Sequence, residues 1–199
     1  MDLPADRSWP AGRGIAGLGA SLLLKNSWSA VDFPQIPKAE IPLSIYSTKA
    51  QQLIELPLKS RYQMYVCGIT PYDSTHLGHA STYLTFDLIN RYIAAIGGEV
   101  HFVENVTDID EPLLERAARD GISWQELGLQ QVELFQSDMT ALHVIPPEYF
   151  VPVTEVMDGI VDSINLLNTN GFTYRLDNDL SFDVSSFIQR LDDLGIDFE

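Results

Sequence analysis

The sequence is poor in cysteine, in basic residues and in long apolar runs, and each shortage excludes a class of protein. Cys67 is the single cysteine among 199 residues, so no internal disulfide can form. This excludes a disulfide-stapled secreted domain and favours a reducing, cytoplasmic compartment. The longest markedly apolar run, Gly14–Leu24, is about half as long as the roughly 20 residues that a membrane-spanning helix needs. The residues before it lack the positive excess of a secretory signal, and we expect no membrane partner.

Basic residues are scarce. Lysine and arginine number 12 against 28 aspartates and glutamates, which gives a formal net charge of −16. The charges balance up to residue 99, so the acidic excess lies in residues 100–199. Such a chain repels phosphate backbones at long range, and tRNA is therefore disfavoured as a partner. A local loop can still bind a phosphate through backbone N–H groups.

What the sequence does contain is a pattern of short strands and amphipathic helices, with 45% hydrophobic residues to form a core. Residues 1–42 are rich in proline, glycine and serine, and we expect an irregular lead-in there. The remaining elements are expected, in chain order, as strands over 43–46, 52–55 and 62–66, a helix over 78–96, a strand over 99–106, helices over 112–119, 123–142 and 154–168, and a hairpin of 172–176 with 180–184. Strand, loop, helix and strand over 62–106 predict a βαβ unit with a parallel pair, hence an α/β fold.

Chemistry-bearing residues are concentrated in the loop that follows the strand ending at Val66. The loop reads Cys67-Gly68-Ile69-Thr70-Pro71-Tyr72-Asp73-Ser74-Thr75-His76-Leu77-Gly78-His79. It follows the carboxyl end of a parallel strand, where open α/β folds bind ligands. Gly78 permits close approach of a ligand, and His76 and His79 are spaced to lie on one side of the first helical turn. Beside a helix N-terminus, this arrangement suits a nucleotide phosphate.

Each of these residues also has a plainer explanation. A His-x-x-His pair is more often a surface or helix-capping pair, and the same spacing also occurs in zinc sites. A cysteine at a strand end more often packs than binds a ligand. Asn105 and Thr107, taken alone, indicate turn and capping roles. The acidic residues of the second half are expected on solvated helix faces, and only the combination of motifs favours a functional site.

That combination resembles the first signature of the class I aminoacyl-tRNA synthetases, the His-Ile-Gly-His box, here His76-Leu77-Gly78-His79. The flanking stretches are similar to the cysteine-activating branch, and they read Tyr65-Val66-Cys67-Gly68 and Asn105-Val106-Thr107-Asp108-Ile109-Asp110. Two families of this branch compete: the cysteinyl-tRNA synthetases and the mycothiol-biosynthesis cysteine ligases, which join cysteine to the amine of glucosaminyl-inositol. Residues 69–88, 113–121 and Ser27-Trp28 resemble the ligases more closely, whereas the synthetases typically have an arginine where Ser81 stands.

The resemblance implies a class I synthetase-like Rossmann fold, with residues 43–122 as the first half of the nucleotide-binding domain and 123–199 as a helical and hairpin insertion. It also implies that cysteine is adenylated by ATP, with Mg²⁺, and that an amine then attacks the cysteinyl-adenylate. His76 and His79 match the catalytic residues that stabilise the phosphates. The residues that match adenylate contacts are Cys67, Gly68, Ile69, Thr70, Gly78, Thr82, Asn105, Val106 and Thr107. Cys67 also matches the first ligand of a zinc ion that binds the substrate thiolate.

Two features of the family are absent from the sequence. The zinc site needs a second cysteine and a later histidine, and no histidine follows His143. The Lys-Met-Ser-Lys-Ser loop of the second ATP signature is also missing, since no lysine follows Lys59. We therefore expect the N-terminal portion of a small-molecule ligase, a monomer with an incomplete zinc site and weak or no adenylation alone. The alternatives are a cysteinyl-tRNA synthetase or paralogue, and a non-catalytic nucleotide-binding remnant or subunit of a split enzyme.

Overall fold

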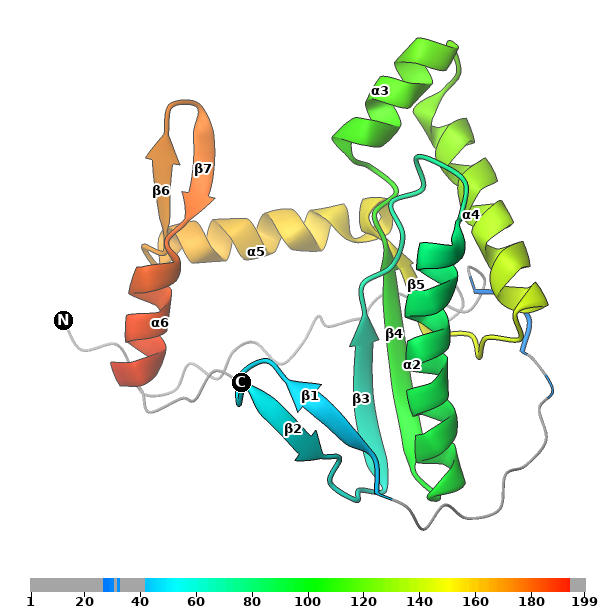
Figure 1. Ribbon diagram of the computed structural model, residues 1–199. Helices are drawn as coiled ribbons and strands as arrows, with labels where there is room; N and C mark the ends of the chain where they lie inside the picture. Colours follow the sequence, from blue (N-terminus) through cyan, green and yellow to red (C-terminus); the bar gives the residue numbers. More distant parts are fainter. Residues whose placement is uncertain (1–26, 31, 33–41, 194–199) are drawn as a thin grey trace. The chain divides into compact units, whose positions relative to one another are not determined.

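The computed structural model describes residues 27–30, 32 and 42–193 (Figure 1). Contacts divide these residues into two units, one with Pro57–Val153 and the described residues up to Leu43, the other with Ser44–Leu56 and the residues from Thr154 on. The candidate site residues all belong to the first unit. The expected lead-in over 1–42 falls largely outside the described residues, and the domain limits placed after residues 42 and 122 stay a prediction.

A three-stranded parallel sheet forms the first unit, in the order β3-β4-β5. Strand β3 (Arg61–Val66) pairs in parallel with β4 (Glu99–Val106), and β4 pairs in parallel with β5 (Tyr149–Pro152). Helix α2 (Leu77–Ala95) connects β3 with β4, so the predicted βαβ unit and α/β class are confirmed. Strand β5 was not predicted, because so short a strand, ending in proline, shows no clear alternation.

The core of this unit lies on one face of the sheet, beneath α2 and α4 (Trp124–Ala141) (Figure 1). Burial alternates along β4, where Phe102, Glu104 and Val106 are 6%, 0% and 1% exposed. From α4, the Phe135 ring contacts three aromatic rings of this core, and its centroid lies 4.9 Å from that of Tyr83. Trp28 joins the same cluster and donates from Nε1 to the Val144 carbonyl at 2.9 Å. This cluster thus packs α2 and α4 against the sheet that carries the loop after β3.

A buried ion pair joins α2 to the segment that precedes β5. Arg91 Nε lies 2.6 Å from a carboxylate oxygen of Asp87, whose side chain is only 4% exposed. The other Asp87 oxygen accepts the backbone N–H of Ile145 at 2.9 Å, and Arg91 also donates to the His143 carbonyl. Because Asp87 and Arg91 each also bond to the backbone of residues 143–145, the pair fixes α2 against the segment that leads into β5.

Two further helices pack on each other in the first unit. Asp110 caps α3 (Glu111–Asp120) by accepting the Glu111 N–H at 2.8 Å, and Gly121, with φ of 69°, ends it. Ser123 caps α4 by accepting the Glu126 N–H at 3.4 Å. A small apolar cluster joins the pair, formed by Leu113, Ala117 and Leu127 with Trp124 against it. The helices predicted over 112–119 and 123–142 are confirmed to within a residue at each end.

The second unit consists of short elements with little buried surface. Strands β1 (Ser44–Ser47) and β2 (Gln52–Glu55) form an antiparallel hairpin, as do β6 (Thr173–Leu176) and β7 (Asp179–Phe182). A 3₁₀ turn over Val153–Val156 leads from the first unit into α5 (Met157–Thr169), and α6 (Val184–Asp193) follows β7. The predicted hairpin of 172–176 with 180–184 is confirmed, and so are the strands expected over 43–46 and 52–55 and the helix over 154–168. Helix α6 was not predicted. No helix in 42–193 is both long and apolar enough to cross a membrane.

Candidate active site

The predicted site residues from two segments meet at the carboxyl ends of β3 and β4. Asn105 Oδ1 accepts the backbone N–H of Gly68 at 3.1 Å and the Tyr65 hydroxyl at 2.9 Å. The Thr107 N–H donates to the Ile69 carbonyl at 2.9 Å. These bonds join the segment after β3 to the segment after β4, as expected for neighbouring parallel strands.

Gly68 is required at this junction by close packing of the main chain. A Cβ at this position would lie 1.5 Å from the Asn105 carbonyl oxygen, well inside any real contact distance. The neighbouring Cys67 is an exposed free thiol. The strand end therefore presents a sulfur to solvent beside a glycine whose N–H is bound by Asn105 Oδ1.

His76 and His79 cap the start of α2 with their ring nitrogens. His76 Nδ1 accepts the Gly78 N–H at 3.0 Å, and His79 Nδ1 accepts the His76 N–H at 3.2 Å. The two rings lie side by side, with centroids 4.1 Å apart. The capping role considered for this pair is thus observed, because each imidazole satisfies a backbone donor that the helix leaves unpaired.

Capping also decides which way the imidazoles present their protons. A nitrogen that accepts a backbone N–H carries no proton, so each neutral ring is protonated at Nε2. Burial, and secondarily His76, hold the pKa of His79 below its ordinary value, which favours this neutral form. Two Nε2–H donors beside a helix N-terminus form a group suited to binding phosphate oxygens.

The other predicted site residues take different positions around this pair. Gly78 leaves room for the His76 ring, because a Cβ there would lie 2.7 Å from its Cε1. The exposed Thr82 hydroxyl donates to the Gly78 carbonyl at 3.1 Å. Ile69 and Val106 are 5% and 1% exposed and belong to the core cluster. Only their backbone atoms can reach a ligand at the surface.

Two buried polar residues beneath the loop were not identified as site residues from the sequence. Glu104 has no exposed surface, and neither of its carboxyl oxygens has a hydrogen-bond partner in the described part of the chain. Burial raises the pKa of Glu104 to about 8, and the nearby Tyr83 hydroxyl offsets only part of this rise. The Tyr83 hydroxyl donates instead to the Cys67 carbonyl at 3.4 Å, and burial raises its pKa far above the ordinary value. Glu104 and Tyr83, beneath the carboxyl end of β3, are therefore both uncharged at neutral pH.

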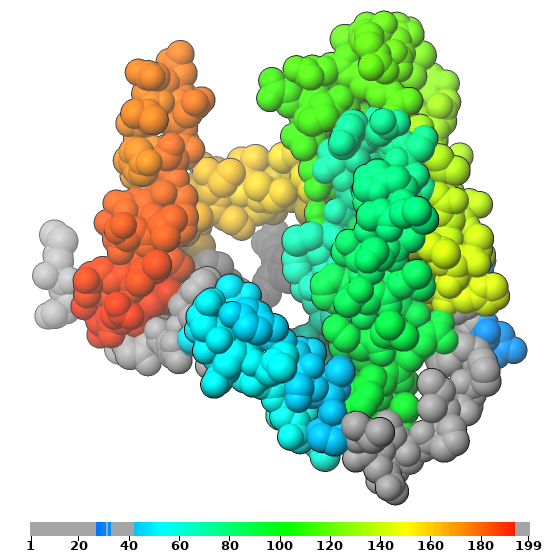
Figure 2. Space-filling model, viewed as in Figure 1, coloured from blue at the N-terminus to red at the C-terminus, as the bar shows by residue number. Residues whose placement is uncertain are grey.

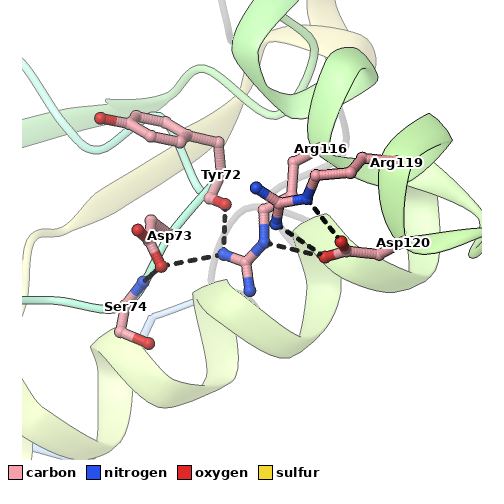
Figure 3. Close-up of polar contacts among 6 residues, drawn as sticks. All are labelled: Tyr72, Asp73, Ser74, Arg116, Arg119 and Asp120. Atoms are coloured by element: carbon pink, nitrogen blue, oxygen red, sulfur yellow. Dashed lines mark hydrogen bonds and ion pairs between the residues drawn. The ribbon is translucent and has the colours of Figure 1, made fainter.

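Arg116 of α3 contacts the loop between β3 and α2 (Figure 3). Its Nη1 donates to the Tyr72 carbonyl and lies 3.0 Å from Asp73 Oδ1, while its Nε lies 3.4 Å from Asp120. Figure 2 shows the blue-green loop at the surface of the first unit, next to the green helix α3. Arg116 was not identified as a site residue from the sequence. The signal that could have drawn attention to it is the scarcity of basic residues, since it is one of few cations among residues 100–199.

Cys67 is the one zinc ligand that the resemblance assigned, in a site expected to be incomplete. Within the described residues, no three His, Cys, Asp or Glu side chains lie close enough together to hold a metal ion. His76 and His79 already use Nδ1 to cap α2. Cys67 can thus supply one ligand, and the described side chains around it do not complete a metal site.

Comparison with known proteins places the chain among class I synthetase-type enzymes, in agreement with the resemblance of the histidine box. Residues 54–192 match the family model described as the tRNA synthetases class I (C) catalytic domain. Among curated relatives, an L-cysteine:1D-myo-inositol 2-amino-2-deoxy-alpha-D-glucopyranoside ligase of Streptosporangium roseum is 50% identical over 160 residues, which is 80% of this chain and 39% of the relative. The proteins of the same name from Thermobispora bispora and Nocardia farcinica are 48% and 50% identical, over 80% and 76% of this chain and 40% and 37% of theirs. The chain thus spans about two fifths of the length of these relatives.

Proposed function

Because the chain belongs to the family of class I (C) tRNA synthetase catalytic domains, we propose that it forms the histidine-box side of an active site that activates cysteine with ATP. The observation that carries this proposal is the pair of capped imidazoles at the start of α2. Their Nε2–H groups face away from the helix backbone, so they are available to phosphate oxygens. Identity of 50% to a cysteine ligase supports cysteine as the amino acid.

In the proposed reaction, a carboxylate oxygen of cysteine attacks the α-phosphorus of ATP, and the bond to pyrophosphate breaks. His76 and His79 donate Nε2–H to phosphate oxygens as charge grows on them in the transition state. Neutral imidazoles give no proton away in this role, which fits the lowered pKa of His79. In this proposal Cys67 and Gly68, at the carboxyl end of β3, contact the adenylate.

We propose the amine of glucosaminyl-inositol as the acceptor that attacks the cysteinyl carbonyl carbon and releases AMP. The relatives named for this reaction support it, as does the formal charge of −16, which opposes a polyanionic acceptor. The second candidate is tRNA, because the matching family model describes tRNA synthetases. A cytoplasmic monomer fits the single cysteine and a small-molecule substrate.

Mg²⁺ with ATP and zinc at Cys67 belong to the same proposal. A zinc ion would bind the substrate thiolate and so distinguish cysteine from serine. Cys67 would hold it together with ligands that the described residues do not place beside it.

Isothermal titration of the full chain with a non-hydrolysable cysteinyl-adenylate analogue tests the proposal without needing turnover. Removing both imidazoles (His76→Ala with His79→Ala) is expected to weaken binding about 100-fold, at about 1.4 kcal/mol for each hydrogen bond to a charged phosphate. His143→Asn is the matched control, because it removes an exposed imidazole outside the site from a left-handed position that asparagine tolerates. Equal affinity of the double variant and wild type would refute the proposed role of the pair.

The acceptor is tested by a separate assay, with an incubation long enough to detect the weak turnover expected of this chain alone. The chain is incubated with ATP and labelled cysteine, together with glucosaminyl-inositol or with tRNA, and transfer of label is measured. Label on the sugar amine supports the ligase. Label on tRNA alone would contradict it and favour the synthetase.

A further inference from the structure

We propose that Arg116 is a positioning residue, which fixes residues 71–75 from α3 and thereby places His76 and His79 for phosphate binding. The inference rests on the proposed function of the histidine pair. The polar contacts of Arg116 are with Tyr72, Asp73 and Asp120, so it acts through the loop.

The loop has little structure of its own. Among the described residues, the backbone hydrogen bonds outside regular elements include one within this stretch, from the Tyr72 N–H to the Thr70 carbonyl at 2.8 Å. The Ser74 N–H donates to the adjacent Asp73 carboxylate at 2.8 Å. Both are local bonds that shape a turn without attaching it to the sheet. The direction in which the chain enters α2 must therefore be set by contacts with other elements.

Arg116 supplies such a contact with geometry that fits its side chain. One guanidinium nitrogen reaches both the Tyr72 carbonyl and the Asp73 carboxylate, and Nε faces Asp120 one helical turn further on (Figure 3). The side chain is 25% exposed, so it is partly shielded from water. Because the guanidinium is planar and spreads its donors in a fixed fork, both ends of the contact are held at once. A lysine would carry the charge but not the fork.

The helix pair provides two further anchors on either side of this contact. Pro71 is fully buried, and its ring lies 4.0 Å from where a Cβ on Gly128 of α4 would be. The Thr75 hydroxyl donates to the Asp138 carboxylate, also on α4. The α3–α4 pair thus holds the loop at its start, middle and end, and His76 follows directly. A change in the middle anchor is expected to alter the entry into α2 without unfolding either helix.

The test compares three single variants of the full chain: Arg116→Met, Arg116→Lys and, as the matched control, Arg119→Met. Arg119 lies on the same helix and is 70% exposed, and its hydrogen bonds go to Asp120. Amide hydrogen exchange over residues 72–79, the ¹⁵N signals of the histidine rings and affinity for the adenylate analogue are measured. Arg116→Met is expected to speed exchange of this segment and to weaken binding, each about tenfold, because the competent loop is populated less. Arg116→Lys should recover only part of both, and Arg119→Met should match wild type.

The outcomes separate this inference from the proposed function. If wild type binds and Arg116→Met binds equally well, the inference is wrong. If wild type does not bind the analogue, the proposed function fails, and the inference is then decided by the exchange rates and ring signals. Unchanged exchange over 72–79 and unchanged histidine signals in Arg116→Met would overturn it. Equal acceleration across the whole unit would also overturn it, because that would indicate a general loss of stability.

Discussion

The buried carboxyl of Glu104 predicts an unusual pH dependence of stability. In the unfolded chain this group loses its proton near pH 4.5, whereas burial in the folded state raises its pKa to about 8. The folded state therefore holds one more proton than the unfolded state between these values. Stability from this group is complete below the unfolded pKa and is lost as the pH rises toward the folded pKa.

The magnitude follows from the size of the shift. Each pH unit in this window lowers the free energy of unfolding by about 1.4 kcal/mol. Glu104→Gln keeps the shape of the side chain and removes the titration. From about pH 5.5 to about pH 7.5, the stability of the variant relative to wild type should therefore rise by about 2.7 kcal/mol. The comparison concerns the change with pH, so a constant offset from the new amide cancels.

Urea denaturation followed by tryptophan fluorescence measures this, since Trp28 lies in the same core as the carboxyl. Glu99→Gln is the matched control on the same strand, because its carboxylate is 62% exposed and pairs only at the surface. Its profile should run parallel to wild type. If the profile of Glu104→Gln also runs parallel to wild type, the carboxyl is not held in its neutral form and the reasoning is wrong.

Three other predictions follow from the packing and capping of the first unit. Gly68→Ala should lower the free energy of unfolding by about 3 kcal/mol, since main chain must move to admit the methyl group; Gly128→Ala, where the nearest atom is 3.5 Å away, should be neutral or stabilising by up to about 1 kcal/mol in the same urea assay. Long-range ¹H–¹⁵N spectra should show protonated Nε2 and bare Nδ1 in His76 and His79, and the Nδ1–H tautomer in both rings would contradict the capping geometry. The stability due to His79 should decline as the pH falls below its ordinary pKa of 6.5, because the unfolded state then binds a proton first. Asp87→Ala should cost about 3 kcal/mol by leaving a largely buried guanidinium without its carboxylate, and a loss below about 1 kcal/mol would show the pair to be dispensable.

The elements and the histidine loop could be predicted because their signals are local. The helix over residues 78–96 showed apolar residues at helical spacing and a Gly97-Gly98 stop, and the structure has Leu77–Ala95. The site motif is contiguous around the end of β3, so its convergence with Asn105 required only one parallel pairing. Glu104 lies two residues after Phe102 on β4, a spacing that places both on the buried side of the strand.

What could not be predicted depends on contacts between distant segments. Alternation placed Glu104 on the buried face but could not show that its carboxyl lacks a partner, which depends on the packing of α2 above it. Arg116 looked like one more charge on an amphipathic helix, since its loop contact joins residues 44 positions apart. Among the described strands, β5 pairs with β4 alone, and four residues carry too little pattern to reveal this. The zinc ion, the domain limits and the lead-in stay predictions.

The close packing of Gly68 against the Asn105 carbonyl also limits how this site can be redesigned. Saturation mutagenesis aimed at a new ligand preference gains nothing at residue 68, because every alternative side chain begins with the atom that does not fit. Diversity has to be introduced at the exposed neighbours, Cys67 and Thr82, whose side chains can change without moving a strand. A library built on those positions keeps the two strand ends joined, and its failures would then report on chemistry instead of folding.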